Sequence, residues 1–139
     1  IDFDWEKNYE GLSKELKLEA TVTQVRNEIC IKIVDGRELK SKDHAILEIT
    51  DSKNEKLGEF VGLMKLSKQG GKIFAEKYEK LIKTSTGTFH EANSLDDAYF
   101  TDMLQELIES NVDITPISVN GKWCEIDTMQ DLKRAEEIF

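Results

Sequence analysis

Two short runs of alternating apolar and polar residues near the start of the chain constrain its fold most strongly. Residues 19–25 alternate around their apolar side chains, and residues 29–34 place three isoleucines on one face. A period of two is typical of half-buried β-strands. Asn27-Glu28 separates the two runs and Asp35-Gly36 follows the second, and both pairs favour turns. We therefore expect an antiparallel hairpin.

A third strand signal is the dense apolar run at residues 59–66. Glu59, Gly62 and Lys65 are its only residues that are not apolar. Near-continuous apolarity over a strand length is typical of a central strand covered on both faces, so we expect one here. Shorter extended patterns are present at 45–50, 114–119 and 123–127, and the wholly polar stretch 51–56 is expected to be an exposed loop.

The spacing of apolar residues becomes helical in three later segments. We expect helices at about 72–83, 95–108 and 129–139. Ser94 and Thr128 provide N-caps for the last two, with Asp97 and Asp131 three residues further on, while Gly70-Gly71 should delay the first helix. The order of strands and helices predicts an α/β layer with an inserted antiparallel hairpin.

Length and composition bound the classes of function. The chain of 139 residues fits one compact domain or part of a larger one. Its net charge of −9 argues against a nucleic-acid partner, which needs a concentrated basic face. No run approaches the roughly 18 apolar residues of a membrane helix. Cys30 and Cys124 are isolated, without zinc-ligand spacing, as expected of reduced thiols in a cytoplasmic protein.

The first five residues, Ile1-Asp2-Phe3-Asp4-Trp5, alternate like the end of a strand and lack an initiator Met. We therefore expect the sequence to begin within a domain, with part of any active site outside it.

Asp127 is the first candidate for chemistry, because it follows an extended run and precedes a helix start. Ligands of open α/β sheets bind beyond the carboxyl ends of strands, where an acid can hold a divalent cation that bridges phosphates. The alternative is that Asp127 only supplements Thr128 as a helix cap.

Glu59 and Lys65 are the second candidates, because a central strand rarely carries two charges unless they are paired or used. Their even separation would place both side chains on one face, and Gly62 between them would admit a ligand to the backbone. The alternative is a strand whose two charged ends reach solvent.

Trp5 and Trp123 are the third candidates, because an indole face attracts an ammonium group. Asp2 and Asp4 beside Trp5 would add charge attraction, unless they form a solvated strand end. The alternative for both tryptophans is a place in the core.

Other enzyme classes lack support in the sequence. His44 and His90 are single histidines in polar loops with no nucleophile arrangement, and exposed loop positions explain them best. Neither a dinucleotide fingerprint nor a P-loop is present in the sequence.

Several segments together carry a resemblance to a known family. They are Gly58-Glu59-Phe60-Val61-Gly62-Leu63 with Lys65-Leu66-Ser67, residues 99–108, Gly121-Lys122-Trp123-Cys124-Glu125-Ile126-Asp127-Thr128, and the ending with Asp131-Leu132 and Ala135-Glu136. This combination resembles the C-terminal half of the sugar-phosphate nucleotidyltransferase family over nearly the whole chain. Within the family it is most similar to cytidylyltransferases associated with phosphonate biosynthesis and to their phosphocholine-using relatives.

The resemblance implies a Rossmann-like fold with a mixed sheet, of which residues 1–139 would form the C-terminal, acceptor-binding and metal-completing part. In the implied reaction an acceptor phosphate or phosphonate attacks the α-phosphorus of a nucleoside triphosphate, with CTP favoured, and pyrophosphate leaves. The family requires Mg²⁺ held by two aspartates, and Asp127 matches the second. The first aspartate and the glycine-rich nucleotide loop would lie outside this sequence, so we expect these residues alone to be inactive.

The resemblance also implies roles for the other candidates. Lys65 would attract the acceptor's anionic group, while Glu59, Gly62, Trp5 and Trp123 would form the acceptor site. A sugar-1-phosphate nucleotidyltransferase and a non-catalytic regulatory or assembly module are the alternatives. Sheet edges left open by a missing half would favour self-association into a homo-oligomer.

Overall fold

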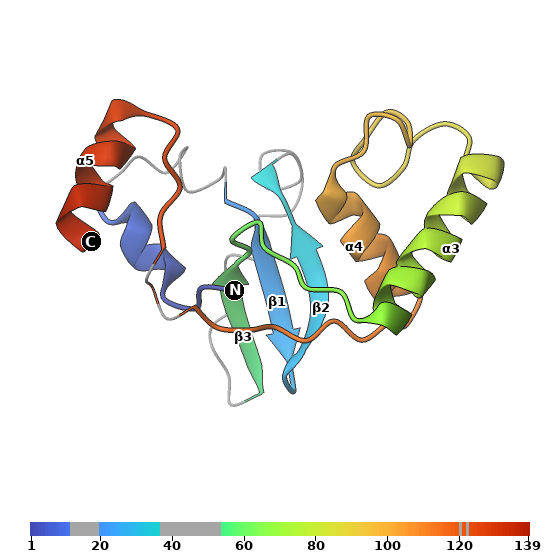
Figure 1. Ribbon diagram of the computed structural model, residues 1–139, viewed down its shortest axis with the longest axis horizontal. Helices are drawn as coiled ribbons and strands as arrows, with labels where there is room; N and C mark the ends of the chain where they lie inside the picture. The colour runs from blue at the N-terminus through green and yellow to red at the C-terminus, as the bar shows by residue number, and fades with distance from the viewer. Residues whose placement is uncertain (12–19, 37–53, 120, 122) are drawn as a thin grey trace.

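The computed structural model describes residues 1–11, 20–36, 54–119, 121 and 123–139. Along the chain these ranges form η1 (Trp5–Tyr9), β1 (Val22–Arg26), β2 (Ile29–Val34), β3 (Glu55–Glu59), α3 (Lys68–Thr84), α4 (Phe100–Glu109) and α5 (Met129–Ile138). The sheet lies in the middle, with α3 and α4 on the side of β2 and with η1 and α5 on the opposite side (Figure 1). None of the helices in these ranges is both long and apolar enough to cross a bilayer.

β1 and β2 form the predicted antiparallel hairpin. The turn residues Asn27 and Glu28 both have left-handed backbone conformations, with φ values of 50° and 64°. Two successive residues of positive φ are typical of the turn whose twist matches a two-stranded ribbon. The hairpin prediction is therefore confirmed.

The central strand is β1, and the prediction of a central strand at 59–66 is wrong. The strand order is β2-β1-β3, and both described strand pairs are antiparallel, whereas a mixed sheet was expected. β3 ends at Glu59, and after Phe60 donates a last backbone hydrogen bond to Thr21, Gly62 turns the chain with a φ of 74°. Four successive residues of β1 are buried, so both faces of this strand are covered.

The polar residues Glu55 and Lys56 were expected in a loop, and they begin β3 instead. They pair with Arg26 and Val25 of β1, and the Arg26 guanidinium contacts the Glu55 carboxylate at 2.6 Å. Cross-strand pairing of opposite charges explains why a wholly polar stretch can enter a sheet.

The other expected strands differ in their outcomes. Residues 45–50 lie outside the described ranges. The segments 114–119 and 123–127 are not strands, although single backbone bonds tie Ile114 to Cys30 and Val119 to Ile1. Pro116 within the first segment lacks the N–H that a regular ladder needs.

All three predicted helices are present, with different starts for two of them. Helix α3 begins before the expected position, because the Ser67 hydroxyl caps it by accepting from the Gly70 N–H at 2.9 Å. Helix α4 begins after Tyr99, whose N–H donates to Asp102, while Ser94 and Asp97 close a separate turn. Helix α5 begins after Thr128, as expected.

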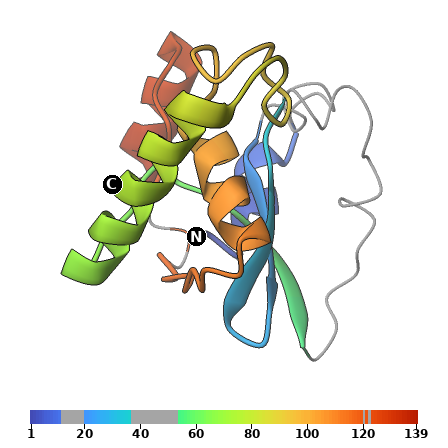
Figure 2. The same cartoon turned by 90° about the vertical axis from the view of Figure 1, so that its right-hand side faces the viewer.

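Helix α4 packs on the sheet against β2, and Met103, Leu104 and Leu107 are its buried apolar residues. Helix α3 lies outside α4 (Figure 2). The ring of Phe74 on α3 stacks on that of Phe100 on α4. A second apolar cluster on the other side of the molecule contains Trp5, Ala20, Val22 and Val34, with Tyr9 and Leu57 packed against it.

Gly58 in β3 is required by a close approach of the N-terminal segment. A Cβ atom at this position would lie 2.3 Å from Cγ2 of Ile1 and 2.9 Å from the ring of Phe3. We expect Gly58→Ala to lower the free energy of unfolding by about 1–3 kcal/mol, the usual cost of overpacking.

Gly71→Ala provides the matched control, because a Cβ there meets nothing within 4 Å and alanine favours a helix. Urea unfolding of both variants measures the difference. Equal stability of the two variants would show that the N-terminal segment does not pack on β3 as described.

Candidate functional site

Two buried acids face each other where the N-terminal segment meets the end of β3. Asp2 and Glu59 form an isolated antiparallel bridge, in which each N–H donates to the other residue's carbonyl oxygen at 2.9 and 2.8 Å. Asp2 is 0% exposed and Glu59 is 4% exposed. Acids are rarely buried without partners, so their contacts indicate what each contributes.

The Asp2 carboxylate joins the beginning of the chain to residues near its end. One oxygen accepts from the backbone N–H groups of Asp4 and Gly121 at 3.0 and 3.1 Å. The other accepts from the Trp123 indole N–H at 3.0 Å and from the Asn8 amide at 3.4 Å. This single carboxylate therefore orients the Trp123 ring and the chain that leads to Asp127.

Glu59 is held differently, with one oxygen bonded and the other without a partner. The Tyr9 hydroxyl donates to Oε1 at 2.6 Å, while Oε2 is buried with no hydrogen-bond partner among the described residues. Burial raises the pKa of Glu59 to about 7, the Tyr9 bond opposes the shift, and the charges of Glu125 and Asp2 add to it. Burial also raises the pKa of Tyr9, and Glu59 adds to that shift. Glu59 therefore exchanges its proton near neutral pH, the range suited to acid–base chemistry.

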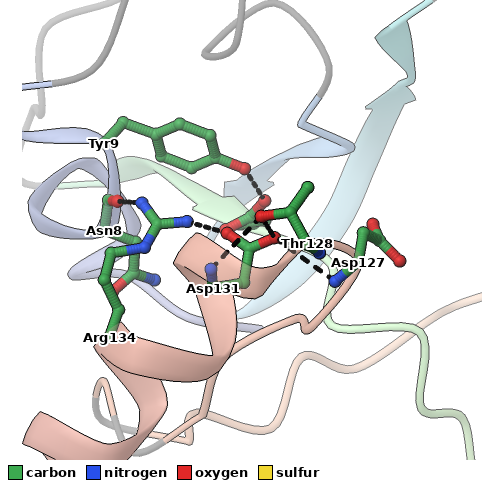
Figure 3. A network of polar contacts seen from close by, with 7 residues as sticks. Asn8, Tyr9, Asp127, Thr128, Asp131 and Arg134 are labelled. Atoms are coloured by element: carbon green, nitrogen blue, oxygen red, sulfur yellow. Dashed lines mark hydrogen bonds and ion pairs between the residues drawn. The ribbon is translucent and has the colours of Figure 1, made fainter.

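Asp127 immediately precedes Thr128, the N-cap residue of α5 (Figure 3). One oxygen of Asp131 accepts from the Thr128 hydroxyl, from the Thr128 N–H and from the Asp127 N–H, and its other oxygen pairs with Arg134. These bonds, led by the Thr128 hydroxyl, lower the pKa of Asp131 to about 2. Thr128 and Asp131 therefore cap the helix.

The side chain of Asp127 is not part of this cap. It is exposed and points away from Thr128, Asp131 and Tyr9 in Figure 3, and Asp127 contributes only its backbone N–H. The geometry therefore does not support the alternative in which the Asp127 side chain supplements the Thr128 cap. Arg134 also donates to the Asn8 carbonyl, which ties α5 to η1.

The structure brings together only part of the predicted site. Glu59 and Trp123 are linked through Asp2, and Trp5 is 2% exposed in the core, where it meets Tyr9 edge to face at 5.9 Å. Trp5 therefore occupies the place in the core that was the alternative to an acceptor-binding role. A contact between Trp5 and an acceptor stays a prediction.

Lys65 and Gly62 lie on the exposed segment after β3. The expectation that Glu59 and Lys65 share one strand face is wrong, because the strand ends at Glu59. Lys65 forms no ion pair with a residue of the described ranges, so its exposed ammonium can meet an anionic ligand.

Tyr9 was missed as a site residue by sequence reasoning. Asp2 was expected only to add charge beside Trp5 or to form a solvated strand end, whereas it is buried. The alternation of residues 1–5 was a signal for Asp2, since it predicted a strand end there, but it gave no sign that the carboxylate would accept from Trp123. Tyr9 carried no local signal, because its partner Glu59 is distant in the sequence.

A Mg²⁺ site at Asp127 stays a prediction, for which the chain offers one carboxylate. Mg²⁺ is usually bound through one or two carboxylates together with substrate phosphates. The exposed carboxylate of Asp127, directed away from the cap, matches one such protein ligand.

A comparison with proteins of known function gives one informative similarity. The chain is 30% identical over 102 residues to a CTP:phosphoglutamine cytidylyltransferase of Campylobacter jejuni, an alignment that covers 71% of this chain and 39% of that enzyme. No protein-family model matches the chain, and no solved structure matches it. The chain is thus similar to part of a nucleotidyltransferase and spans less than half of its length.

Replacing Asp2 with asparagine tests the junction. Asp2→Asn replaces one of the two carboxylate oxygens with an NH₂ group, which then faces the two hydrogen-bond donors that this oxygen had accepted from. We expect a loss of about 2–4 kcal/mol in the free energy of unfolding, since buried donors left without partners cost about 1–3 kcal/mol each. Asp4→Asn is the matched control, because its ion pair with Lys7 is exposed and contributes little to stability. Equal losses in the two variants would contradict the account.

The raised pKa of Glu59 predicts a pH-dependent stability. A pKa raised from 4.5 to about 7 on folding favours the protonated form, so this stabilisation is complete below pH 4.5 and is lost as the pH rises through 7. Between pH 4.5 and 8 the wild type should lose about 1–3 kcal/mol relative to Glu59→Gln, whose side chain does not titrate. Urea unfolding across this range measures the difference, and parallel stability curves would refute the shift.

Proposed function

We propose that the protein is a nucleotidyltransferase that transfers CMP from CTP to a small acceptor bearing a phosphate or phosphonate, with release of pyrophosphate. The observation that carries this proposal is the 102-residue similarity to a CTP:phosphoglutamine cytidylyltransferase. The chain would form the C-terminal part of a Rossmann-like nucleotidyltransferase domain, and a nucleotide-binding part would complete the enzyme.

In this proposal Asp127 is the chain's ligand for Mg²⁺. The α5 cap fixes its backbone, while its carboxylate stays exposed toward a ligand. When bound, Mg²⁺ supplies positive charge that stabilises the triphosphate and the leaving pyrophosphate. Asp2 acts as a positioning residue, because its bonds to Gly121 and Trp123 anchor the segment that leads to Asp127.

The acceptor would bind between the same segment and the chain after β3. Trp123 is half-buried and held by Asp2, so it offers a fixed aromatic surface near the buried acids. Such a surface, surrounded by negative charge, suits an acceptor with a cationic group. Exposed Lys65 and the backbone at Gly62, which no side chain covers, would receive its anionic group. A 2-aminoethylphosphonate or phosphocholine acceptor meets both requirements.

The test is pyrophosphate release by the intact protein that contains this chain, with Mg²⁺. The nucleotides are CTP, UTP, ATP and GTP, and the acceptors are 2-aminoethylphosphonate, phosphocholine, phosphoglutamine and a sugar-1-phosphate. We expect turnover with CTP and one small acceptor, and a loss of at least about 100-fold in Asp127→Ala, because metal charge stabilisation is worth several kcal/mol.

Asp113→Ala, another exposed acid, is the matched control and should retain full activity. Absence of turnover with every pair, or full activity of Asp127→Ala, would refute the proposal. The 139-residue chain alone should neither turn over nor bind CTP with micromolar affinity.

A further inference from the structure

We propose that His90, Glu106 and Glu109 bind a divalent transition-metal ion, with Zn²⁺ the best match. Glu106 and Glu109 belong to α4 and His90 to the segment between α3 and α4, and α4 lies on the opposite side of the sheet from α5 (Figure 1). The proposal rests on their own geometry and is independent of the proposed nucleotidyltransferase activity.

The ligand atoms of the three residues already converge. One ligand atom from each lies within 4.8 Å of the other two, and Nε2 of His90 is 3.2 Å from Oε2 of Glu106. Zn²⁺ binds imidazole nitrogen and carboxylate oxygen at about 2.0–2.2 Å in tetrahedral geometry, so the ligand atoms around one ion are roughly 3.4 Å apart. Small rotations of side chains, with no change in the backbone, would close the site.

Each ligand is supported by the fold. Glu106 and Glu109 are three residues apart on α4, a spacing that places both on one helix face. His90 is presented by a tight turn closed by two backbone bonds between Phe89 and Ala92, in which His90 has a φ of 49°. His90 is therefore only 18% exposed in its side chain, whereas an exposed loop position was expected.

Gln105 provides a second layer of support. Its amide oxygen accepts from the Ile33 N–H of β2 at 2.9 Å, and its amide nitrogen donates to Oε1 of Glu109 at 2.9 Å. The Glu109 carboxylate is thus oriented by a residue that is itself fixed to the sheet. Partners of this kind are typical of metal ligands, whose orientation depends on an outer layer of hydrogen bonds.

A pocket of about 220 Å³ adjoins the cluster and is lined by two of its three residues. His90, Glu109 and Gln105 line it, together with Asp35, Glu91 and Asp102. Lys32 also lines the pocket, but the four acids outnumber this one cation, so the lining favours a positively charged ligand. The presence of an imidazole nitrogen indicates a transition metal, because Mg²⁺ and Ca²⁺ prefer oxygen ligands alone.

Lys77 supplies the competing explanation. Its ammonium lies 2.5 Å from Oε1 of Glu106 and 2.7 Å from the Ser110 hydroxyl, so the cluster could serve only to join α3 to α4. However, Lys77 contacts one oxygen of Glu106 and His90 contacts the other. Oε2 can therefore take an ion while the ion pair with Lys77 remains.

The experiment is a calorimetric titration of Zn²⁺ into the full chain, with excess Mg²⁺ to occupy sites made of oxygen ligands alone. We expect one Zn²⁺ per chain. His90→Asn and Glu109→Gln should each weaken binding by more than about tenfold, since even changes outside the ligand set cost 10–100-fold. Glu79→Gln, an exposed acid on α3, is the matched control and should bind as the wild type does.

Two results would overturn the proposal. One is the absence of Zn²⁺ binding by the wild type under these conditions, which would leave the cluster as an ion-pair network. The other is Zn²⁺ binding that is equally tight in His90→Asn and Glu109→Gln, which would place the ion elsewhere. Circular dichroism of each variant verifies its fold, and Glu109→Gln alters an exposed side chain, so its result stands even if His90→Asn is unstable.

Discussion

The carboxylate of Asp2 is the interaction on which the candidate site depends. It accepts from Asp4, Asn8, Gly121 and Trp123, and so joins residues more than a hundred positions apart in the chain. Because the segment 110–128 contains no strand or helix among its described residues, such individual contacts hold it in place. The position of the α5 cap relative to the sheet follows from this junction and from the Arg134 bond to η1.

The same region separates two kinds of acid by their surroundings. Both carboxylate oxygens of Asp2 accept hydrogen bonds, whereas one buried oxygen of Glu59 has no partner among the described residues and the pKa of Glu59 is raised to about 7. Asp127 is exposed at a helix start. Three acids with different surroundings thus lie around one short segment. Asp2 anchors it, Glu59 exchanges its proton near neutral pH, and the carboxylate of Asp127 is exposed. Environments that divide acids in this way are characteristic of sites that bind or transform ligands.

Sequence patterns predicted the elements whose signals are local. The hairpin around Asn27-Glu28 and the Thr128 cap depend on neighbouring residues, and both are as expected. The run 59–66 was misassigned because apolarity cannot tell a central strand from a strand end followed by a turn at Gly62. The contacts of the site could not be predicted, because the partners of Asp2 and Glu59 come from distant parts of the chain. His90 was likewise assigned to solvent, since Glu106 reaches it only through the packing of α4.

The central claim is that Asp127 binds the metal that accompanies the nucleotide and that Trp123 lies close to it, in the acceptor site. Paramagnetic broadening by Mn²⁺ in the presence of CTP, followed by NMR of the intact protein, measures proximity to the bound metal directly. The account predicts that the amide of Asp127 and the indole N–H of Trp123 broaden only when Mn²⁺ and CTP are both present, while Glu79 on α3 is unaffected. Broadening that does not depend on CTP, or that spares Asp127, would contradict it.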